Sequence, residues 1–308
     1  PEDGRMNTRR GPPESLNLNV RGMRPSATVA INEHSNALIA AGRTVYKLGL
    51  GQSPFPVPPT VVEALRQHAH RKEYMPVRGL AELRTAVAEF HRRRAGLPWH
   101  CEADDVLVAP GSKELMFIVQ LAFYGDLLLP SPSWVSYSPQ AQIIGRQVCF
   151  LPTRAEDRWM LRPGTLDAHC RRDRGRPRIL ILNYPSNPTG QSFTLDELAA
   201  LAEVAREHQL IVISDEIYGE LHHAGEHRSI AEFYPEGTIL SSGLSKWCGA
   251  GGWRLGTFLF PPQLRWLRDA MTAVASETYT TTSAPIQCAA ITAFACGPEI
   301  DEIGRAHV

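Results

Sequence analysis

Short apolar runs alternate with amphipathic stretches along most of the chain, and the two patterns predict different elements. Apolar residues recur at helical spacing in residues 60–70 and 80–94, and residues 28–41 are also helix-like. Continuous apolar runs, which indicate strands buried on both faces, occur at Val106–Val108, Leu127–Leu129, Arg178–Leu182, Leu210–Ile213, Thr238–Leu240 and Leu255–Phe260. The alternation predicts an α/β fold in which helices cover both faces of a mostly parallel sheet.

Two further helices are predicted between these strands. Residues 112–123 have the pattern of a buried helix, and a capping box of Thr194 and Glu197 begins a helix that runs to His208. In sheets of this kind, ligands bind beyond the carboxyl ends of the strands. The residues that directly follow each strand are therefore the first candidates for a functional site.

Two of these positions suit an anion and a flat ring. Gly111, Ser112 and Lys113 follow the first strand and start a helix, where free N–H groups and the helix dipole attract anions. Glycine before a helix is also common without any ligand. Trp134 follows the second strand on a proline-rich loop, and it is either a stacking surface or an aromatic residue of the core.

Polar side chains follow the next two strands. Asn187 lies in an Asn- and Pro-rich turn, for which turn chemistry alone is a sufficient explanation. Asp215 comes shortly after a buried strand, and Tyr218 follows three residues later. A buried carboxylate is costly unless a donor or a cation pairs with it, so Asp215 has either a structural or a functional role.

A lysine and an arginine follow the strand at Thr238–Leu240. Ser245 and Lys246 come first, and a glycine-rich segment then leads to Arg254. Burial lowers the pKa of a lysine and makes it a nucleophilic amine. The guanidinium of Arg254 is suited to bidentate binding of a phosphate.

Together these residues match the needs of a single ligand, pyridoxal 5′-phosphate (PLP). PLP requires a lysine that forms a Schiff base and an acidic partner for its pyridinium nitrogen. Lys246 and Asp215 meet these two needs. Asn187 and Tyr218 suit the ring oxygen, and Trp134 suits the ring face. The phosphate is matched by Gly111, Ser112, Lys113 and Arg254.

These motifs resemble those of the class I and II aminotransferases, a fold-type I family of PLP enzymes that includes aspartate aminotransferase. The resemblance covers residues 46–297, and its most specific elements are Asn187-Pro188-Thr189-Gly190, Asp215-x-x-Tyr218, Ser245-Lys246 and Gly252-Trp253-Arg254-x-Gly256. It implies a three-layer α/β/α large domain that transfers an amino group from an L-amino acid to a 2-oxo acid. It also implies a homodimer.

The resemblance assigns a role to each candidate residue. Lys246 forms an aldimine with PLP and moves the proton, Asp215 keeps the ring nitrogen protonated, and Tyr218 acts with them. Asn187 and Tyr218 bind the ring oxygen, and Trp134 stacks on the ring. The phosphate contacts are Gly111, Ser112, Lys113, Ser245 and Arg254. Tyr74 reaches the phosphate of the neighbouring subunit, while Gly51 and Asn187 contact the substrate.

Three departures from the family pattern bear on substrate and domains. Gly243 stands where a phosphate-binding serine is frequent, and Ser245 is a candidate replacement. Residues 276–287 contain no arginine for a dicarboxylate substrate. The family's C-terminal small domain, with its carboxylate-binding arginine, is expected to be missing. We expect residues 1–50 to form an N-terminal arm and part of a small domain, and residues 51–301 the PLP-binding large domain. Residues 302–308 resemble a translated sequencing adapter, which predicts a non-native tail.

Composition excludes several other classes of protein. The 308 residues include 32 Lys+Arg and 32 Asp+Glu, and this balance argues against a nucleic-acid partner. No apolar run approaches the about 18 residues of a membrane span. The six cysteines form no C-x-x-C pair, which suits a reducing compartment. A cytoplasmic location follows as the expectation.

Other functions remain open at the level of the sequence. Lys246 and Asp215 would equally serve a PLP-dependent lyase or synthase, because the pocket selects which bond breaks. A sensor domain, or a fragment that binds PLP without catalysis, is a further alternative. His222, His223 and His227 lie together without a cysteine cluster, so no metal is predicted.

Overall fold

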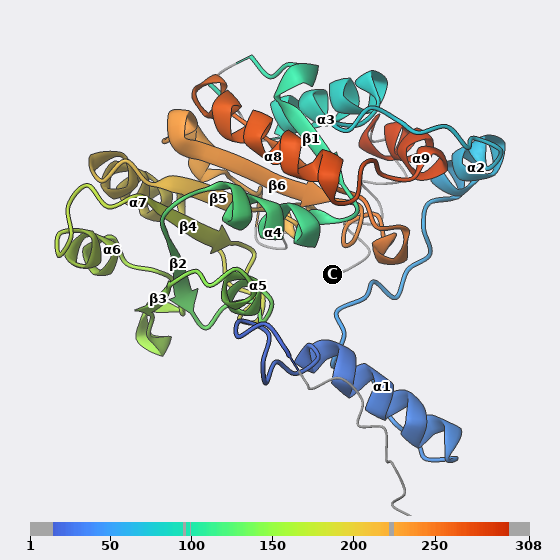
Figure 1. Ribbon diagram of the computed structural model, residues 1–308, viewed down its shortest axis with the longest axis horizontal. Helices are drawn as coiled ribbons and strands as arrows, with labels where there is room; N and C mark the ends of the chain where they lie inside the picture. Colours follow the sequence, from blue (N-terminus) through green and yellow to red (C-terminus); the bar gives the residue numbers. More distant parts are fainter. Residues whose placement is uncertain (1–14, 95–96, 99, 222–224, 296–308) are drawn as a thin grey trace, which may run out of the picture.

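The computed structural model describes residues 15–94, 97–98, 100–221 and 225–295. Its centre is a seven-stranded sheet with the strand order β1-β7-β6-β5-β4-β2-β3 (Figure 1). The strands are β1 (Val106–Ala109), β2 (Asp126–Ser131), β3 (Val148–Pro152), β4 (Arg178–Asn183), β5 (Ile211–Asp215), β6 (Thr238–Gly243) and β7 (Gly256–Leu259). Six of these were predicted; β3 was not.

The sheet is mostly parallel, as the continuous apolar runs predict. Strands β3, β2, β4, β5 and β6 pair in parallel along the sheet. Strand β7 is inserted between β6 and β1 and is antiparallel to both. The α/β fold class is therefore confirmed, and the carboxyl ends of β4, β5 and β6 lie at one edge.

Helices α2 to α9 pack around the sheet, and α1 precedes them in the chain. The helices are α1 (Ala27–Ala40), α2 (Pro59–His68), α3 (Ala81–Arg94), α4 (Ser112–Ala122), α5 (Tyr137–Ile143), α6 (Pro163–Cys170), α7 (Leu195–Glu207), α8 (Arg265–Glu277) and α9 (Ala284–Ala295). The predicted capping box of α7 is confirmed: Thr194 Oγ1 accepts from the Glu197 N–H at 3.3 Å, and Glu197 Oε2 accepts from the Thr194 N–H at 2.9 Å.

Three groups of buried apolar side chains hold these layers together. On one face, α4, α5 and α8 pack on the sheet through residues such as Leu115, Tyr137 and Met271. On the other face, α6 and α7 pack on β2, β4 and β5. Helices α2, α3 and α9 form a third group with β1, β6 and β7. The strands other than the edge strand β3 are thus shielded from water on both faces, which is why they lack the alternation of half-exposed strands.

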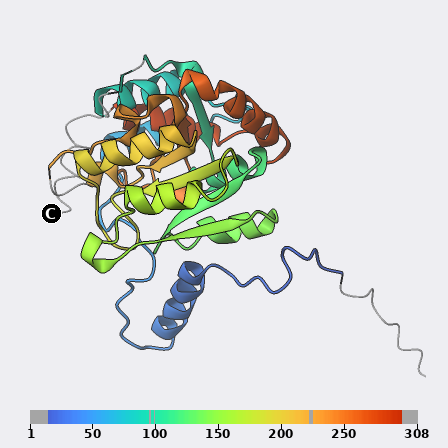
Figure 2. The same ribbon diagram turned by 90° about the vertical axis from the view of Figure 1, so that its left-hand side faces the viewer.

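Helix α1 lies apart from these layers. It buries no residue, and Figure 2 shows it set off from the sheet at the end of an extended segment. The proposed boundary near residue 50 stays a prediction, and residues 302–308 lie outside the described part of the chain. Within the described ranges, no helix is long and apolar enough to cross a lipid bilayer.

Candidate active site at the carboxyl edge of the sheet

The turns after β4, β5 and β6 bring three predicted residues together. Asn187 lies in the turn after β4, Tyr218 follows β5 and Lys246 follows β6. The Asn187 Nδ2 donates a hydrogen bond to the Tyr218 hydroxyl at 3.5 Å. Lys246 Nζ lies 5.5 Å from the centre of the Tyr218 ring. The three residues therefore meet at the carboxyl edge of the parallel strands, where ligands bind in sheets of this kind.

Lys246 is half-buried and faces a backbone carbonyl. Its Nζ donates to the Gly51 carbonyl oxygen at 2.7 Å. A Cβ at Gly51 would lie 3.8 Å from this Nζ and 3.9 Å from the Tyr218 hydroxyl, so Gly51 lies directly beside both groups. Burial lowers the pKa of Lys246; the charge of Asp215 opposes this shift and the charge of Arg254 adds to it. A larger share of this amine is therefore neutral and nucleophilic near neutral pH.

Asp215, the last residue of β5, is buried beneath the site with 4% of its surface exposed. Its Oδ2 accepts from the Tyr137 hydroxyl at 2.5 Å, and its Oδ1 accepts from the Ser241 hydroxyl at 3.2 Å. Burial raises the pKa of Asp215 to about 6, although both hydrogen bonds act in the opposite direction. No basic side chain of the described residues forms an ion pair with it, although the charge of Lys246 acts on it from a greater distance.

Sequence reasoning missed both hydroxyl donors to Asp215. Ser241 lies opposite Asp215 in the β5–β6 register, so the alignment of parallel strand ends was the signal that could have found it. Tyr137 comes from α5, which has no clear helical pattern in the sequence. Its position three residues after Trp134 carries no such signal.

Gly111 and Arg254 form a cradle at the start of α4. Arg254 has a left-handed backbone (φ 57°), and its guanidinium donates to the carbonyl oxygens of Gly251 at 2.8 Å and Pro110 at 3.3 Å. A Cβ at Gly111 would lie 2.2 Å from Arg254 Nη2, and Gly111 itself has φ 97°. Only glycine lets the guanidinium approach the helix start, where unbonded N–H groups also point.

The replacement of a serine by Gly243 has a steric reason. A Cβ at Gly243 would lie 2.6 Å from the Leu255 carbonyl oxygen and 2.9 Å from the Gly256 Cα. Its neighbour on β7 is equally tight, because a Cβ at Gly256 would lie 1.9 Å from the backbone nitrogen of Ser112. The sheet and α4 meet here through backbone alone. Position 243 therefore offers no side-chain contact to a phosphate, and Ser245, which is half-buried, stays the candidate replacement.

Lys113 and Trp134 contact each other. The Lys113 ammonium lies 5.6 Å from the centre of the Trp134 ring, and the edge of that ring packs against Tyr137 at 5.2 Å between centroids. The Lys113 side chain thus points toward the Trp134 ring. Tyr74 is different: it is 88% exposed, and within the described residues it forms no hydrogen bond with Lys246 or Arg254.

A hollow of about 380 Å³, open to solvent, lies beside this group. Its polar lining includes Asn183, Ser186 and Asn187, and its apolar lining includes Trp159 and Phe193. Lys246 does not line it. The hollow therefore extends from the Asn187 side of the site, between the ends of β2 and β4.

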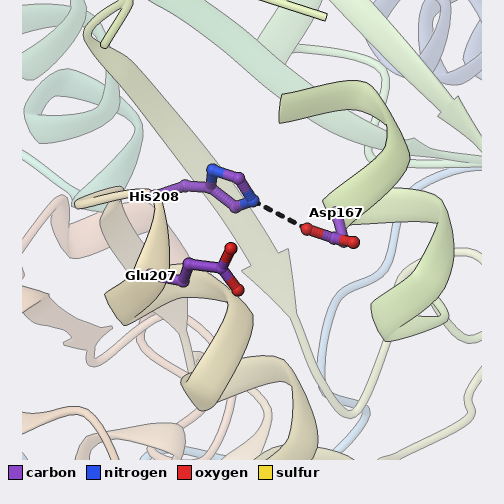
Figure 3. A group of neighbouring side chains, drawn as sticks. All are labelled: Asp167, Glu207 and His208. Atoms are coloured by element: carbon purple, nitrogen blue, oxygen red, sulfur yellow. Dashed lines mark hydrogen bonds and ion pairs between the residues drawn. The ribbon is translucent and has the colours of Figure 1, made fainter. Parts of the chain in front are cut away.

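A second cluster of acid and base groups joins α6 to α7 away from this edge (Figure 3). His208 Nε2 lies 2.8 Å from an Asp167 oxygen, and the exposed Glu207 is close by. Arg171 already binds both Asp167 oxygens, at 2.7 and 2.8 Å, and approaches Glu207 at 3.5 Å. These contacts make the cluster an ion-pair network. Of the three histidines considered above, His222 and His223 lie outside the described residues, and His227 pairs with Glu216 at 3.0 Å.

The comparison with protein families agrees with this fold and with the polar residues at the carboxyl edge of the sheet. Residues 43–302 match the model of the aminotransferase class I and II family. The chain belongs to this family.

Individual relatives are aminotransferases. The chain is 34% identical to the aspartate aminotransferase of Geobacillus stearothermophilus, over 91% of this chain and 71% of that protein. It is 34% identical to the aspartate/prephenate aminotransferase of Thermus thermophilus, over 90% and 71% of the two chains. The crystal structure of Thermus thermophilus aspartate aminotransferase with maleate superposes with a TM-score of 0.86 at 33% identity, covering 95% of this chain and 75% of that one.

Proposed function

We propose that this chain is the PLP-binding part of an aminotransferase that transfers an amino group from an L-amino acid to a 2-oxo acid. Family membership supports the reaction class. The observation that carries the cofactor assignment is Asp215: a buried carboxylate with a raised pKa that forms no ion pair with a described basic side chain. A protonated pyridine nitrogen is the kind of cation that this position requires.

The remaining groups fit the other parts of PLP. The cradle of Gly111, Arg254 and the start of α4 suits a phosphate, since a Cβ at position 111 would fill it. Asn187 Nδ2 and the Tyr218 hydroxyl are close enough to share one ring oxygen. Lys246 offers an amine with a lowered pKa for the aldehyde carbon. Trp134, fixed by Tyr137 and Lys113, offers a ring face for stacking.

Each of these residues then has a defined chemical role. When bound, PLP supplies an electron-withdrawing ring that stabilises negative charge at the substrate Cα. Asp215 holds the proton on the ring nitrogen, while Tyr137 and Ser241 keep Asp215 ionised by donating to its two oxygens. Lys246 Nζ binds the cofactor and, once free, accepts and returns the Cα proton.

Substrate and assembly are proposed only by class. Relatives carry the names aspartate aminotransferase, aspartate/prephenate aminotransferase and asparagine–oxo-acid transaminase, so the amino donor is an L-amino acid of unspecified side chain. Residues 276–287 contain no arginine, which gives no support to dicarboxylate recognition from that segment. We propose a homodimer in which the exposed Tyr74 reaches the neighbouring site, and a substrate contact at Gly51 and Asn187.

Absorption spectroscopy of the purified chain with PLP tests this proposal. We expect a visible band that survives dialysis, because Lys246 binds the cofactor covalently. The Lys246→Ala variant should lose the band, and the control Lys72→Ala, which changes an exposed lysine, should keep it. An unchanged band in Lys246→Ala would refute the lysine assignment. Amino acids should then bleach the band and release the matching 2-oxo acid; an elimination product would instead indicate a lyase.

A further inference from the structure

Glu216 stands next to Asp215 but belongs to a separate buried cluster. It is 7% exposed, and its Oε1 accepts from the hydroxyls of Ser214 at 2.7 Å and Ser229 at 2.6 Å. Its Oε2 lies 3.0 Å from His227 Nε2. The hydroxyl of Tyr184 donates to the same Oε1 at 3.4 Å. No part of the proposed reaction uses this carboxylate.

Tyr184 connects the cluster to the turn after β4. The side chain is fully buried; its hydroxyl also lies 2.7 Å from Ser214 Oγ and accepts from the Ile230 N–H at 2.9 Å. Its backbone N–H donates to the Asp215 carbonyl oxygen at 3.4 Å. The preceding Asn183 donates to the same carbonyl at 2.9 Å. The turn after β4 is therefore bonded to the end of β5 through both backbone and side chains.

The two turns joined in this way carry Asn187 and Tyr218. Asn183 Oδ1 accepts from the Asn187 N–H at 2.7 Å, which fixes the backbone of Asn187. Glu216 lies two residues before Tyr218 on the other turn, and its N–H donates to the Ser241 carbonyl oxygen at 3.0 Å. The spacing between Asn187 and Tyr218 thus depends on a cluster beneath them.

We infer that Glu216 and Tyr184 are positioning residues, which hold Asn187 and Tyr218 at the spacing that lets both bind one ring oxygen of the cofactor. The inference rests on the proposed function. It distinguishes the two buried carboxylates of this edge, because Asp215 faces the cofactor whereas Glu216 acts only through other residues. It also predicts that a conservative change in the cluster, one that leaves the chain folded, weakens PLP binding through Asn187 and Tyr218.

A double-mutant cycle tests this inference, with the dissociation constant of PLP measured by quenching of tryptophan fluorescence. We expect Tyr184→Phe to weaken binding about 5-fold and Asn187→Ala about 10-fold, since each loses hydrogen bonds of ordinary strength. If Tyr184 acts through Asn187, the double variant should also be weakened only about 10-fold. A second cycle pairs Glu216→Gln with Tyr218→Phe and should show the same non-additivity.

Tyr234→Phe is the matched control. Tyr234 is another buried tyrosine of the same apolar group, but its hydroxyl donates to the Leu210 carbonyl oxygen at 2.8 Å, away from both turns. Tyr234→Phe should leave the dissociation constant of PLP unchanged. Combined with Asn187→Ala, it should give the same about 10-fold weakening as Asn187→Ala alone. An about 50-fold loss in the Tyr184/Asn187 double variant, the product of the single effects, would overturn the inference alone. Absence of PLP binding by the unchanged chain would overturn the proposed function and the inference with it.

Discussion

The surroundings of Asp215 and of Glu216 differ sharply, although the two residues are adjacent and both are buried. Asp215 accepts from two hydroxyls, and burial still raises its pKa to about 6. Burial acts on Glu216 in the same direction, but the charge of His227 and the hydrogen bonds of His227, Ser229 and Ser214 outweigh it and lower the pKa of Glu216. Glu216 has its partners, including His227, within the fold, whereas Asp215 forms no ion pair with a described basic side chain.

This difference separates structure from function at the end of one strand. A buried carboxylate whose partners all lie within the fold holds the surrounding structure in place, whereas a buried carboxylate without an ion pair is a candidate for direct ligand binding. The four predictions that follow test this contrast, beginning with the largest expected effect.

Glu216→Ala should destabilise the protein strongly. Its removal leaves His227 and two serine hydroxyls without their acceptor in a buried place, and loss of one partner from a buried pair costs about 3–5 kcal/mol. Urea denaturation measures the free energy of unfolding. Glu207→Ala, at an exposed carboxylate, is the control and should change it by less than about 0.5 kcal/mol. A loss below about 1 kcal/mol in Glu216→Ala would contradict the compensated role.

Asp215→Asn should have the opposite effect on the cofactor-free protein. Because its pKa is raised from 3.8 to about 6, folded Asp215 binds more protons than unfolded Asp215 between these pH values. Stability contributed by its protonated form is present below pH 4 and lost as the pH rises to about 6. The variant should lack this loss and be up to about 3 kcal/mol more stable at pH 8.

Urea denaturation at pH 4, 6 and 8 checks this prediction, and PLP binding is measured in parallel. The same substitution should abolish tight PLP binding, because asparagine cannot hold the ring proton by charge. A variant less stable than the parent at pH 8 would show that Asp215 is already compensated within the fold.

Tyr137→Phe should raise the pKa of Asp215 further above its ordinary value. The hydroxyl lowers the pKa of Asp215, so its loss lets that pKa rise above 6. Hydrogen bonds to charged groups are worth about 1.5–3 kcal/mol, and PLP binding should weaken about 10-fold or more. The pH at which binding is half-maximal should rise. The Tyr234→Phe control should leave this pH dependence in place.

Ser241→Ala should show the same change on a smaller scale. Its bond to Asp215 is longer, 3.2 Å, and one of two donors remains. Binding of PLP should weaken about 3-fold, less than the loss of a shorter hydrogen bond to the same carboxylate would give. If Ser241→Ala exceeds Tyr137→Phe in a titration of PLP against pH, the assignment of the principal donor is wrong.

The sequence predicts the central parallel strands better than the edge strand, helix α9 and the direction of β7. Strands such as Leu180–Leu182 are buried on both faces, so their apolar runs are uninterrupted. Strand β3 lies at the sheet edge with Phe150 exposed, and helix α9 is apolar all round, so neither has the expected period. The antiparallel direction of β7 comes from its pairing with β1 and β6, which the apolar run Leu255–Phe260 does not reveal.

The candidate site divides in the same way. Asn187 and Lys246 follow strands and Asp215 is the last residue of one, so the topology rule located all three without knowledge of the fold. Tyr137 reaches Asp215 from a helix on a different part of the chain, and Glu216 acquires its partners from residues 227–229. These contacts exist only after packing, and no local pattern in the sequence encodes them.

The connection between β6 and β7 carries two of the proposed binding groups, one for each end of a ligand. Residues 244–255 carry both Lys246 and Arg254, and the Gly243–Gly256 pair closes the two strand ends on each other. A ligand anchored by its phosphate therefore presents its carbonyl to the amine at a high effective concentration. Molecules that carry only one of the two groups lose this advantage, so the loop selects for the length of a ligand as well as for its chemistry.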